Sequence, residues 1–363
     1  MTTFRPLRSR GSWIAILALV LIGSASIAEG ASDSTPSKLT YTPWARVCAA
    51  ALVAMSGEKC VTVRSGRGDA GQNVIAAILI EPKGGGTKIL RVALPLGTIL
   101  AGGVRVAVDA DAGTQTIQFM TCLSPGCIAD VEVTAELFER LKKGQILTIQ
   151  AIDARKQPVT FAIPLDDFAR VLAGRPAALA KLDEQTRTVL VSRSDLGSLV
   201  GTPELIYSPW TKFCLKGQAA NATEVCFTGK DVRVASMQVV AAAVIVEPKS
   251  EPRKILRITL ALGAKLADGV RIALDGGATP QVARYVICFA NGCLADFDAT
   301  PDLIGMIRRS NNLVVRATTM DEQPISLPLP LYDFAEIYDG PPLDPKEFEA
   351  RQKKLQEELR SRQ

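Results

Sequence analysis

The chain has 363 residues, a formal net charge of +5 and no histidine, with 47% hydrophobic and 22% charged residues. The absence of histidine excludes Ser-His-Asp and Cys-His nucleophilic systems, imidazole acid–base catalysis and every histidine-containing metal site. The small net charge is not that of a nucleic-acid-binding protein, and the length predicts two domains.

Residues 1–28 have the layout of a secretory signal peptide. Three arginines and no acidic residue precede an apolar run, Trp13–Ile22, and small residues then end at Ala28. A retained anchor is the alternative, but the uncharged stretch thins into Gly, Ser and Ala and is a marginal membrane span. We predict that the segment is removed on export, which leaves no stable span and lowers the charge from +5 to +2 by the loss of three arginines.

The rest of the chain carries one pattern twice, W-x3-C-x11-C followed by C-x4-C, and each member of the second copy lies 166 positions after its counterpart. Residues 78–97 and 244–263 match at ten of twenty positions. Two copies of this size predict two complete domains and not a solenoid. The members are Trp44, Cys48, Cys60, Cys122 and Cys127, then Trp210, Cys214, Cys226, Cys288 and Cys293.

Within each copy, short Val/Ile/Leu-rich runs separated by Gly and Pro predict β-strands, such as VIAAILIEP, KILRVALPLG and QILTIQAID in the first. Several runs do not alternate, which predicts strands covered on both faces. One helix is expected over Ala135–Lys143, closed by Gly144. Its counterpart begins at Thr300-Pro301 and runs to about Arg309. PLDDFARVL and PLYDFAEIY each predict a strand that passes into a short helix.

These elements predict a mainly β protein with two tandem β-sandwich, immunoglobulin-like domains, each with one or two short helices. We expect the first domain at 43–172, a structured connector at 173–207, the second domain at 208–342 and a charged helical tail at 343–363. Solvation of that tail is favoured over a coiled-coil partner surface, because its apolar stripe is only one or two heptads long.

Eight cysteines in an exported chain favour disulfides. A four-residue hairpin loop within C-x4-C brings its flanking residues together, so the favoured bonds are Cys122–Cys127 and Cys288–Cys293, which leaves Cys48–Cys60 and Cys214–Cys226. Chain entropy alone favours crossed pairs with longer loops. Zinc bound by the four cysteines of each repeat, or a redox-active pair, is the alternative, although neither fits the usual C-x2-C spacing.

Other polar residues give weaker signals. The pairs Asp130/Asp296 and Asp167/Asp333 are candidate acid–base partners, but Asp more often ends a strand or caps a helix. No catalytic residue, metal site or cofactor is predicted.

Arginines and tryptophans recur at equivalent positions. Arg91 and Arg257 lie inside apolar strands, and we expect cations at a strand edge or on an outer face, with an anion contact or a buried ion pair as the alternatives. The tryptophans are expected to anchor the two cores.

The ordered motifs PW-x3-C, EP-x5-KILR, YVICFANGCLADFDATPDLI and QPISLPLPLYDFAEIYDGPPLDPKEF resemble the bacterial invasion-associated locus B family, closely over 209–348 and more loosely over 43–172. The resemblance implies an exported, periplasmic or envelope-associated protein with a β-sandwich-like fold, of a family linked to interaction with host cells. Family members commonly carry one such domain, whereas this chain carries two.

The function that we expect is therefore a non-enzymatic envelope or secreted interaction protein, located in the periplasm or outside the cell. Its partner would be an envelope or host protein or a glycan, and not a nucleic acid. A structural or stress-related periplasmic factor without a host role is the alternative, and an enzyme that uses carboxylates is a third reading.

Overall fold

The structure is a computed structural model, and it describes residues 39–50, 52, 57–109, 114–192, 194–201, 204–216, 223–236, 238–275, 279–344 and 347. The predicted signal peptide lies outside these residues, as does nearly all of the predicted C-terminal helix.

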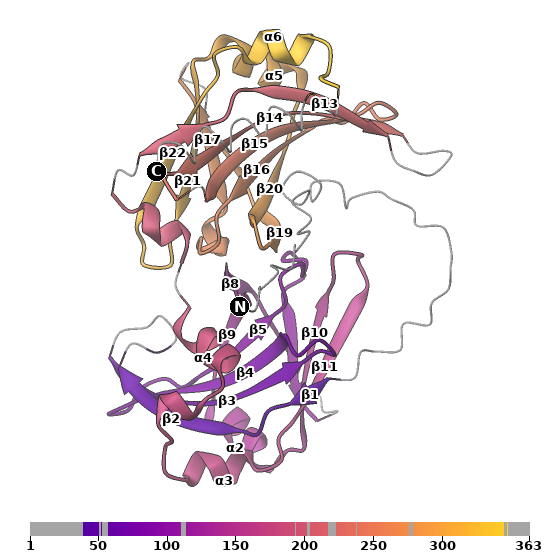
Figure 1. The fold of residues 1–363 in the computed structure, drawn as a ribbon. Helices are drawn as coiled ribbons and strands as arrows, with labels where there is room; N and C mark the ends of the chain where they lie inside the picture. The colour runs from indigo at the N-terminus through magenta and orange to yellow at the C-terminus, as the bar shows by residue number, and fades with distance from the viewer. Residues whose placement is uncertain are drawn as a thin grey trace, which may run out of the picture.

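The first domain is built on a seven-stranded antiparallel sheet in the order β1-β3-β4-β5-β9-β8, with β2 also paired to β3 (Figure 1). Its strands are rich in Val, Ile and Ala, which suit a pleated and buried surface. They are β1 (Thr40–Tyr41), β2 (Ala45–Ala50), β3 (Glu58–Arg67), β4 (Asn73–Pro82), β5 (Ile89–Leu94), β8 (Phe119–Leu123) and β9 (Gly126–Glu132).

A four-stranded sheet in the order β11-β10-β6-β7 packs against the larger one, and the core lies between them. Two helices complete the domain. These elements are β6 (Val104–Val108), β7 (Gln115–Ile117), α2 (Ala135–Lys143), β10 (Ile146–Ile152), β11 (Pro158–Pro164) and α3 (Phe168–Ala173).

The second domain repeats this topology, with sheets β12-β14-β15-β16-β20-β19 and β18-β17-β21-β22 and with β13 paired to β14. The predicted pair of tandem β-sandwiches is confirmed. The elements are β12 (Leu205–Tyr207), β13 (Thr211–Lys216), β14 (Glu224–Val234), β15 (Val239–Pro248), β16 (Ile255–Leu260), η4 (Leu266–Asp268), β17 (Val270–Leu274), β18 (Gln281–Ala283), β19 (Tyr285–Phe289), β20 (Gly292–Asp298), α5 (Pro301–Arg309), β21 (Asn312–Thr318), β22 (Pro324–Pro330) and α6 (Phe334–Asp339).

The helices α2 and α5 begin and end where the sequence predicts. The hydroxyl of Thr134 accepts a hydrogen bond from the N–H of Leu137, and Thr300 accepts one from Leu303 in the same way. Each threonine satisfies one of the free N–H groups at a helix start. The expected passage from strand to short helix is also confirmed, at β11–α3 and β22–α6.

The connector packs on the outer face of the first domain's large sheet. Leu190 is fully buried there against Val61 and Ile78, away from the core between the two sheets. This packing explains why these strands do not alternate, since both faces of the sheet are covered. The connector contains η2 (Leu179–Lys181), α4 (Glu184–Val191) and η3 (Leu196–Leu199).

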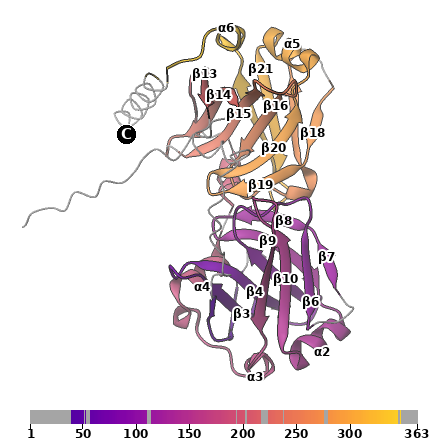
Figure 2. The same ribbon diagram turned by 90° about the vertical axis from the view of Figure 1, so that its right-hand side faces the viewer.

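The two domains meet end to end through equivalent elements, as Figure 2 shows for β8 and β19. The loop after β5 runs along β19, where the N–H of Leu100 donates to the carbonyl of Val286 over 2.9 Å. In the reverse direction, η4 of the second domain contacts β8 of the first. The reciprocal use of the same two elements gives the contact an approximate twofold symmetry.

Candidate functional site

Each domain buries one cation beside its tryptophan, at the junction between the last strand and the last helix. We call these places the tryptophan–cation sites. The first-domain site contains Trp44, Arg64, Pro164 and Asp166, and the second-domain site contains Trp210, Lys230, Pro330 and Tyr332. The residues stand in the same order at the same spacing, but the chemistry of the cation and of its neighbour differs.

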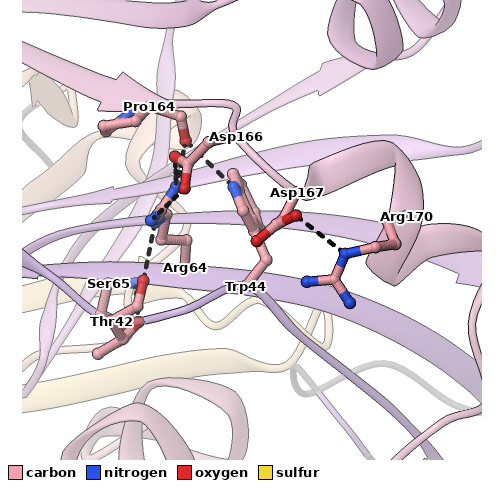
Figure 3. A network of polar contacts seen from close by, with 8 residues as sticks. All are labelled: Thr42, Trp44, Arg64, Ser65, Pro164, Asp166, Asp167 and Arg170. Carbon is pink, nitrogen blue, oxygen red and sulfur yellow. Dashed lines mark hydrogen bonds and ion pairs between the residues drawn. The ribbon is translucent and has the colours of Figure 1, made fainter.

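In the first domain, Arg64 is held by a closed set of partners (Figure 3). Its guanidinium donates to the carbonyl of Pro164 over 2.6 Å and to that of Thr42 over 2.7 Å. The indole N–H of Trp44 donates to the same Pro164 oxygen over 3.1 Å. Both carboxylate oxygens of Asp166 accept from Arg64, in a bidentate pair. The buried charge is therefore neutralised within its own domain.

The strand–helix junction positions that carboxylate. Asp167 has a left-handed backbone with φ of 61°, which Asp tolerates better than most residues, and it starts α3. Phe168 then packs edge-on against Trp44, with 4.9 Å between the ring centroids. Asp167 itself turns to Arg170, over 2.9 Å, instead of capping the helix.

These two carboxylates are ionised and matched by arginines. The hydrogen bond from Arg64 holds the pKa of Asp166 below its usual range, and Arg170 lowers the pKa of Asp167. A general acid needs the opposite, a carboxyl with a raised pKa. The arrangement favours a structural role for both.

The second-domain site lacks such a carboxylate. The ammonium of Lys230 donates to the carbonyl of Pro330 over 3.1 Å, an oxygen that also accepts from Trp210 over 3.0 Å. Where Asp166 stands in the first copy, the second has Tyr332, whose ring centroid is 4.3 Å from the Lys230 ammonium. The rings of Tyr207 and Trp210 lie 5.8 Å away. The lysine is enclosed mainly by aromatic faces.

Burial changes the proton affinity of this lysine. Lys230 is only 3% exposed, and loss of hydration lowers its pKa to about 8. The nearby charge of Asp333 acts in the opposite direction and raises the pKa of Lys230. Tyr332 is 60% exposed, so the outer member of this aromatic cluster faces solvent.

The other aspartates singled out in the sequence form ion pairs inside the large sheets. Arg91 lies opposite Asp130 in β5 and β9, and two hydrogen bonds of 2.7 Å join them. Arg257 and Asp296 repeat this geometry. The expectation of plain edge or outer-face cations for the arginines is therefore wrong, and the ion-pair alternative holds. Both strands lie inside their sheets, and a cross-strand aspartate stands in register with each arginine.

The cysteines face each other across antiparallel strands. The structure contains the bonds Cys48–Cys60 and Cys214–Cys226, each with a Cα separation of 4.0 Å, and Cys122–Cys127 and Cys288–Cys293, each with 3.9 Å. The four-residue hairpin loop expected within C-x4-C is wrong, because Leu123 pairs with Gly126 and only two residues remain in the turn.

A glycine makes that tight turn possible. Gly126 has a positive φ of 150°, which other residues rarely adopt. A Cβ at this position would also lie 2.2 Å from the carbonyl oxygen of Leu94 in β5. The hairpin tips also meet at the domain contact, where the sulfur atoms of Cys122, Cys127 and Cys288 lie within 4.8 Å of one another. These three sulfur atoms come from both repeats, and each is bonded within its own repeat. The zinc site considered from the sequence would instead use the four cysteines of one repeat.

A hollow of about 400 Å³ lies on the outer side of the first domain, between β1 and the connector. Tyr41, Arg67 and Asp183 line it, and an ion pair between Arg67 and Asp183 crosses it over 2.5 Å. Two of its charged groups are thus already paired with each other.

Sequence reasoning placed both tryptophans in the core, which the structure confirms, but missed the cations beside them. One available signal was the 166-residue offset, which aligns Arg64 with Lys230 and Asp166 with Tyr332. The first exchange keeps a positive charge, and the second replaces an aspartate by a tyrosine, so the second-domain site has lost a negative charge.

One family model matches both halves of this chain. The family model described as Invasion associated locus B (IalB) protein matches residues 44–176 and 210–342. Two curated proteins, invasion protein B homologs of Brucella abortus strain 2308 and of Brucella abortus biovar 1 strain 9-941, are each 37% identical over 113 residues. Each alignment covers 31% of this chain and 63% of the relative's length.

A crystal structure of invasion associated protein B from Bartonella henselae was also matched. It shares 21% identity with the chain at a TM-score of 0.32, and the match covers 38% of this chain and 92% of that one.

Proposed function

The chain belongs to the invasion associated locus B family, and on this premise we propose that it is an exported, non-enzymatic interaction protein of the periplasm or the cell exterior. Its partner would be an envelope or host protein or a glycan. The observation that carries the proposal is the duplication: two complete family domains, each with two disulfides, are docked in one chain. Two linked binding surfaces raise avidity without any new contact.

Export is supported by the signal-like N-terminus and by the cysteines. All eight cysteines are bonded in the structure, which suits an oxidising compartment. Among the residues that the structure describes, no helix is long and apolar enough to cross a membrane.

Binding is favoured over catalysis by the state of the acidic groups. Asp130, Asp296, Asp166 and Asp167 all accept hydrogen bonds from arginines of their own domain. Arg64 and Arg170 lower the pKa values of Asp166 and Asp167, whereas a carboxylate general acid needs a raised pKa. The same groups serve well to fix the shape of a binding surface.

Affinity capture tests the proposal. The mature chain, without residues 1–28, is immobilised and exposed to envelope extracts, with the same chain reduced and alkylated at its eight cysteines as the control. We expect partners that the disulfide-bonded chain retains and the reduced chain does not. Identical retention by the two proteins, or a chain found in the cytoplasm with free thiols, contradicts the proposal.

A further inference from the structure

We propose that the second-domain tryptophan–cation site binds a carboxylate-bearing ligand, whose carboxylate takes, beside Lys230, the place that Asp166 takes beside Arg64. This inference rests on the proposed function, since it assigns a ligand class to one of its domains. The ligand would be a small acid or the acidic end of a larger molecule.

The first domain supplies the template. There the cation, the tryptophan and the proline carbonyl meet at one point, and Asp166 closes the outer side with a bidentate pair. The Asp166 side chain is 63% exposed, so this carboxylate approaches the buried cation from the solvent side. The position is therefore one from which an anion reaches the cation.

The second domain keeps a buried cation, the tryptophan and the proline carbonyl of this arrangement, but Tyr332 stands where the first domain has its carboxylate. Trp210 and Lys230 share the Pro330 carbonyl, just as Trp44 and Arg64 share that of Pro164. An ammonium has three N–H donors, and a single oxygen, that of Pro330, accepts from Lys230 among the described residues. The rings of Tyr207, Trp210 and Tyr332 surround the ammonium and are not hydrogen-bonding oxygens, so its two other N–H groups have capacity for a carboxylate.

Tyr332 controls access. It is the exposed ring of the three around Lys230, whereas Trp210 is buried and Tyr207 is half-buried. A ligand reaches the ammonium when the Tyr332 side chain turns outward into solvent. The ring then lies beside the entering group, so a carboxylate on a flat or apolar body fits better than a bare acid.

The remaining charge near the site is Asp333. It follows Tyr332 just as Asp167 follows Asp166, and the first domain accommodates both of those carboxylates. In the first domain Arg170 pairs with Asp167, whereas Glu336 stands at the equivalent position in the second. Asp333 thus weakens binding of an anion, and its removal should strengthen it.

Ligand binding by the mature full-length chain tests the proposal, with benzoate as the probe and benzamide as its uncharged analogue. Calorimetry or ligand-observed NMR should show saturable benzoate binding at least tenfold tighter than benzamide binding. Lys230→Met should abolish the difference. Tyr332→Asp should do so too, since it supplies the carboxylate of the first domain. Asp333→Asn should tighten benzoate binding several-fold.

The first domain offers a reciprocal control. The double substitution Arg64→Lys with Asp166→Tyr should create a second benzoate site, so that two molecules bind per chain. A second pair of probes, glucuronate and glucose, tells whether an acidic sugar is accepted as well as an aromatic acid. Unchanged thermal midpoints would show that each variant is folded.

Benzoate binding no tighter than that of benzamide, or equal in wild type and Tyr332→Asp, overturns the proposal. The two proposals fail separately. If envelope partners are retained by Tyr332→Asp, the interaction function stands and this site is wrong. If benzoate binds as expected and the mature chain retains no envelope partner, the site stands and the interaction function is wrong.

Discussion

The amide N–H of Gly97 in the first domain donates a hydrogen bond to the carbonyl of Cys288 in the second, over an N···O distance of 2.7 Å. Cys288 belongs to the disulfide-bonded hairpin, so the covalent clip of one domain is also a docking element for the other. The next residues extend the contact, with Ile99 bridged to Ile287. The two halves of the duplication are joined through backbone as well as through side chains.

Substitution at the domain contact should destabilise both domains. Ile287 is buried, and Ile287→Asp would place an unpaired carboxylate there, at a cost of about 3 kcal/mol or more. Because the two domains support each other at this contact, the first domain should also unfold at a lower denaturant concentration, although its own sequence is unchanged. In a Trp210→Phe background, the fluorescence of Trp44 reports on that domain alone once the signal peptide is absent.

Val282→Asp is the matched control, since Val282 is 59% exposed in the same domain. It should leave the denaturant midpoint of the Trp44 fluorescence transition unchanged. A Trp44 transition that Ile287→Asp does not move would contradict coupling between the domains.

The buried ion pair predicts a difference between the two copies. The side chains of Arg91 and Asp130 are 9% and 11% exposed, whereas those of Arg257 and Asp296 are 22% and 23% exposed. Asp130→Ala should lower the free energy of unfolding by about 3 kcal/mol, because it removes the carboxylate from a buried guanidinium. Asp296→Ala should cost about 1 kcal/mol, since water screens that pair better.

Urea denaturation measures both values. The double variant Arg91→Met with Asp130→Leu should recover most of the loss, as buried ion pairs often can be replaced by apolar residues. Equal losses for Asp130→Ala and Asp296→Ala would mean that burial does not set the strength of these pairs.

The unusual lysine predicts a dependence of stability on pH. The pKa of Lys230 is about 8 in the folded protein and near 10.5 for an ordinary lysine, so between these values the unfolded chain binds the proton more tightly. The contribution of Lys230 to the free energy of unfolding should therefore rise as pH increases from about 8 to about 10.5. Lys230→Met should remove this rise. The free energy of unfolding is measured against pH for both proteins, and subtracting one curve from the other removes the contribution of all other titrating groups.

Tyr332→Asp supplies a counter-charge and should raise the pKa of Lys230 toward its ordinary value. An NMR titration of the lysine ε-methylene group follows that pKa directly. An unchanged titration in Tyr332→Asp would show that residue 332 does not face the ammonium.

Local signals predicted the helices well, and long-range relationships were out of reach. Thr300 and Pro301 define the start of α5 within a few residues of sequence, because capping depends on neighbours. Arg64 and Asp166 are 102 residues apart, and only the packing of β3 against the end of β11 brings them together. The tight turn at Gly126 was mistaken for a longer loop, since spacing alone does not show which residues pair.

Mass spectrometry of the protein purified from its native envelope fraction tests the central claim most directly, namely that an exported chain folds as two separately clipped family domains. The account predicts an N-terminus at Glu29 and the pairs Cys48–Cys60, Cys122–Cys127, Cys214–Cys226 and Cys288–Cys293. Free thiols, an intact Met1, or a bond that joins one domain to the other would contradict it.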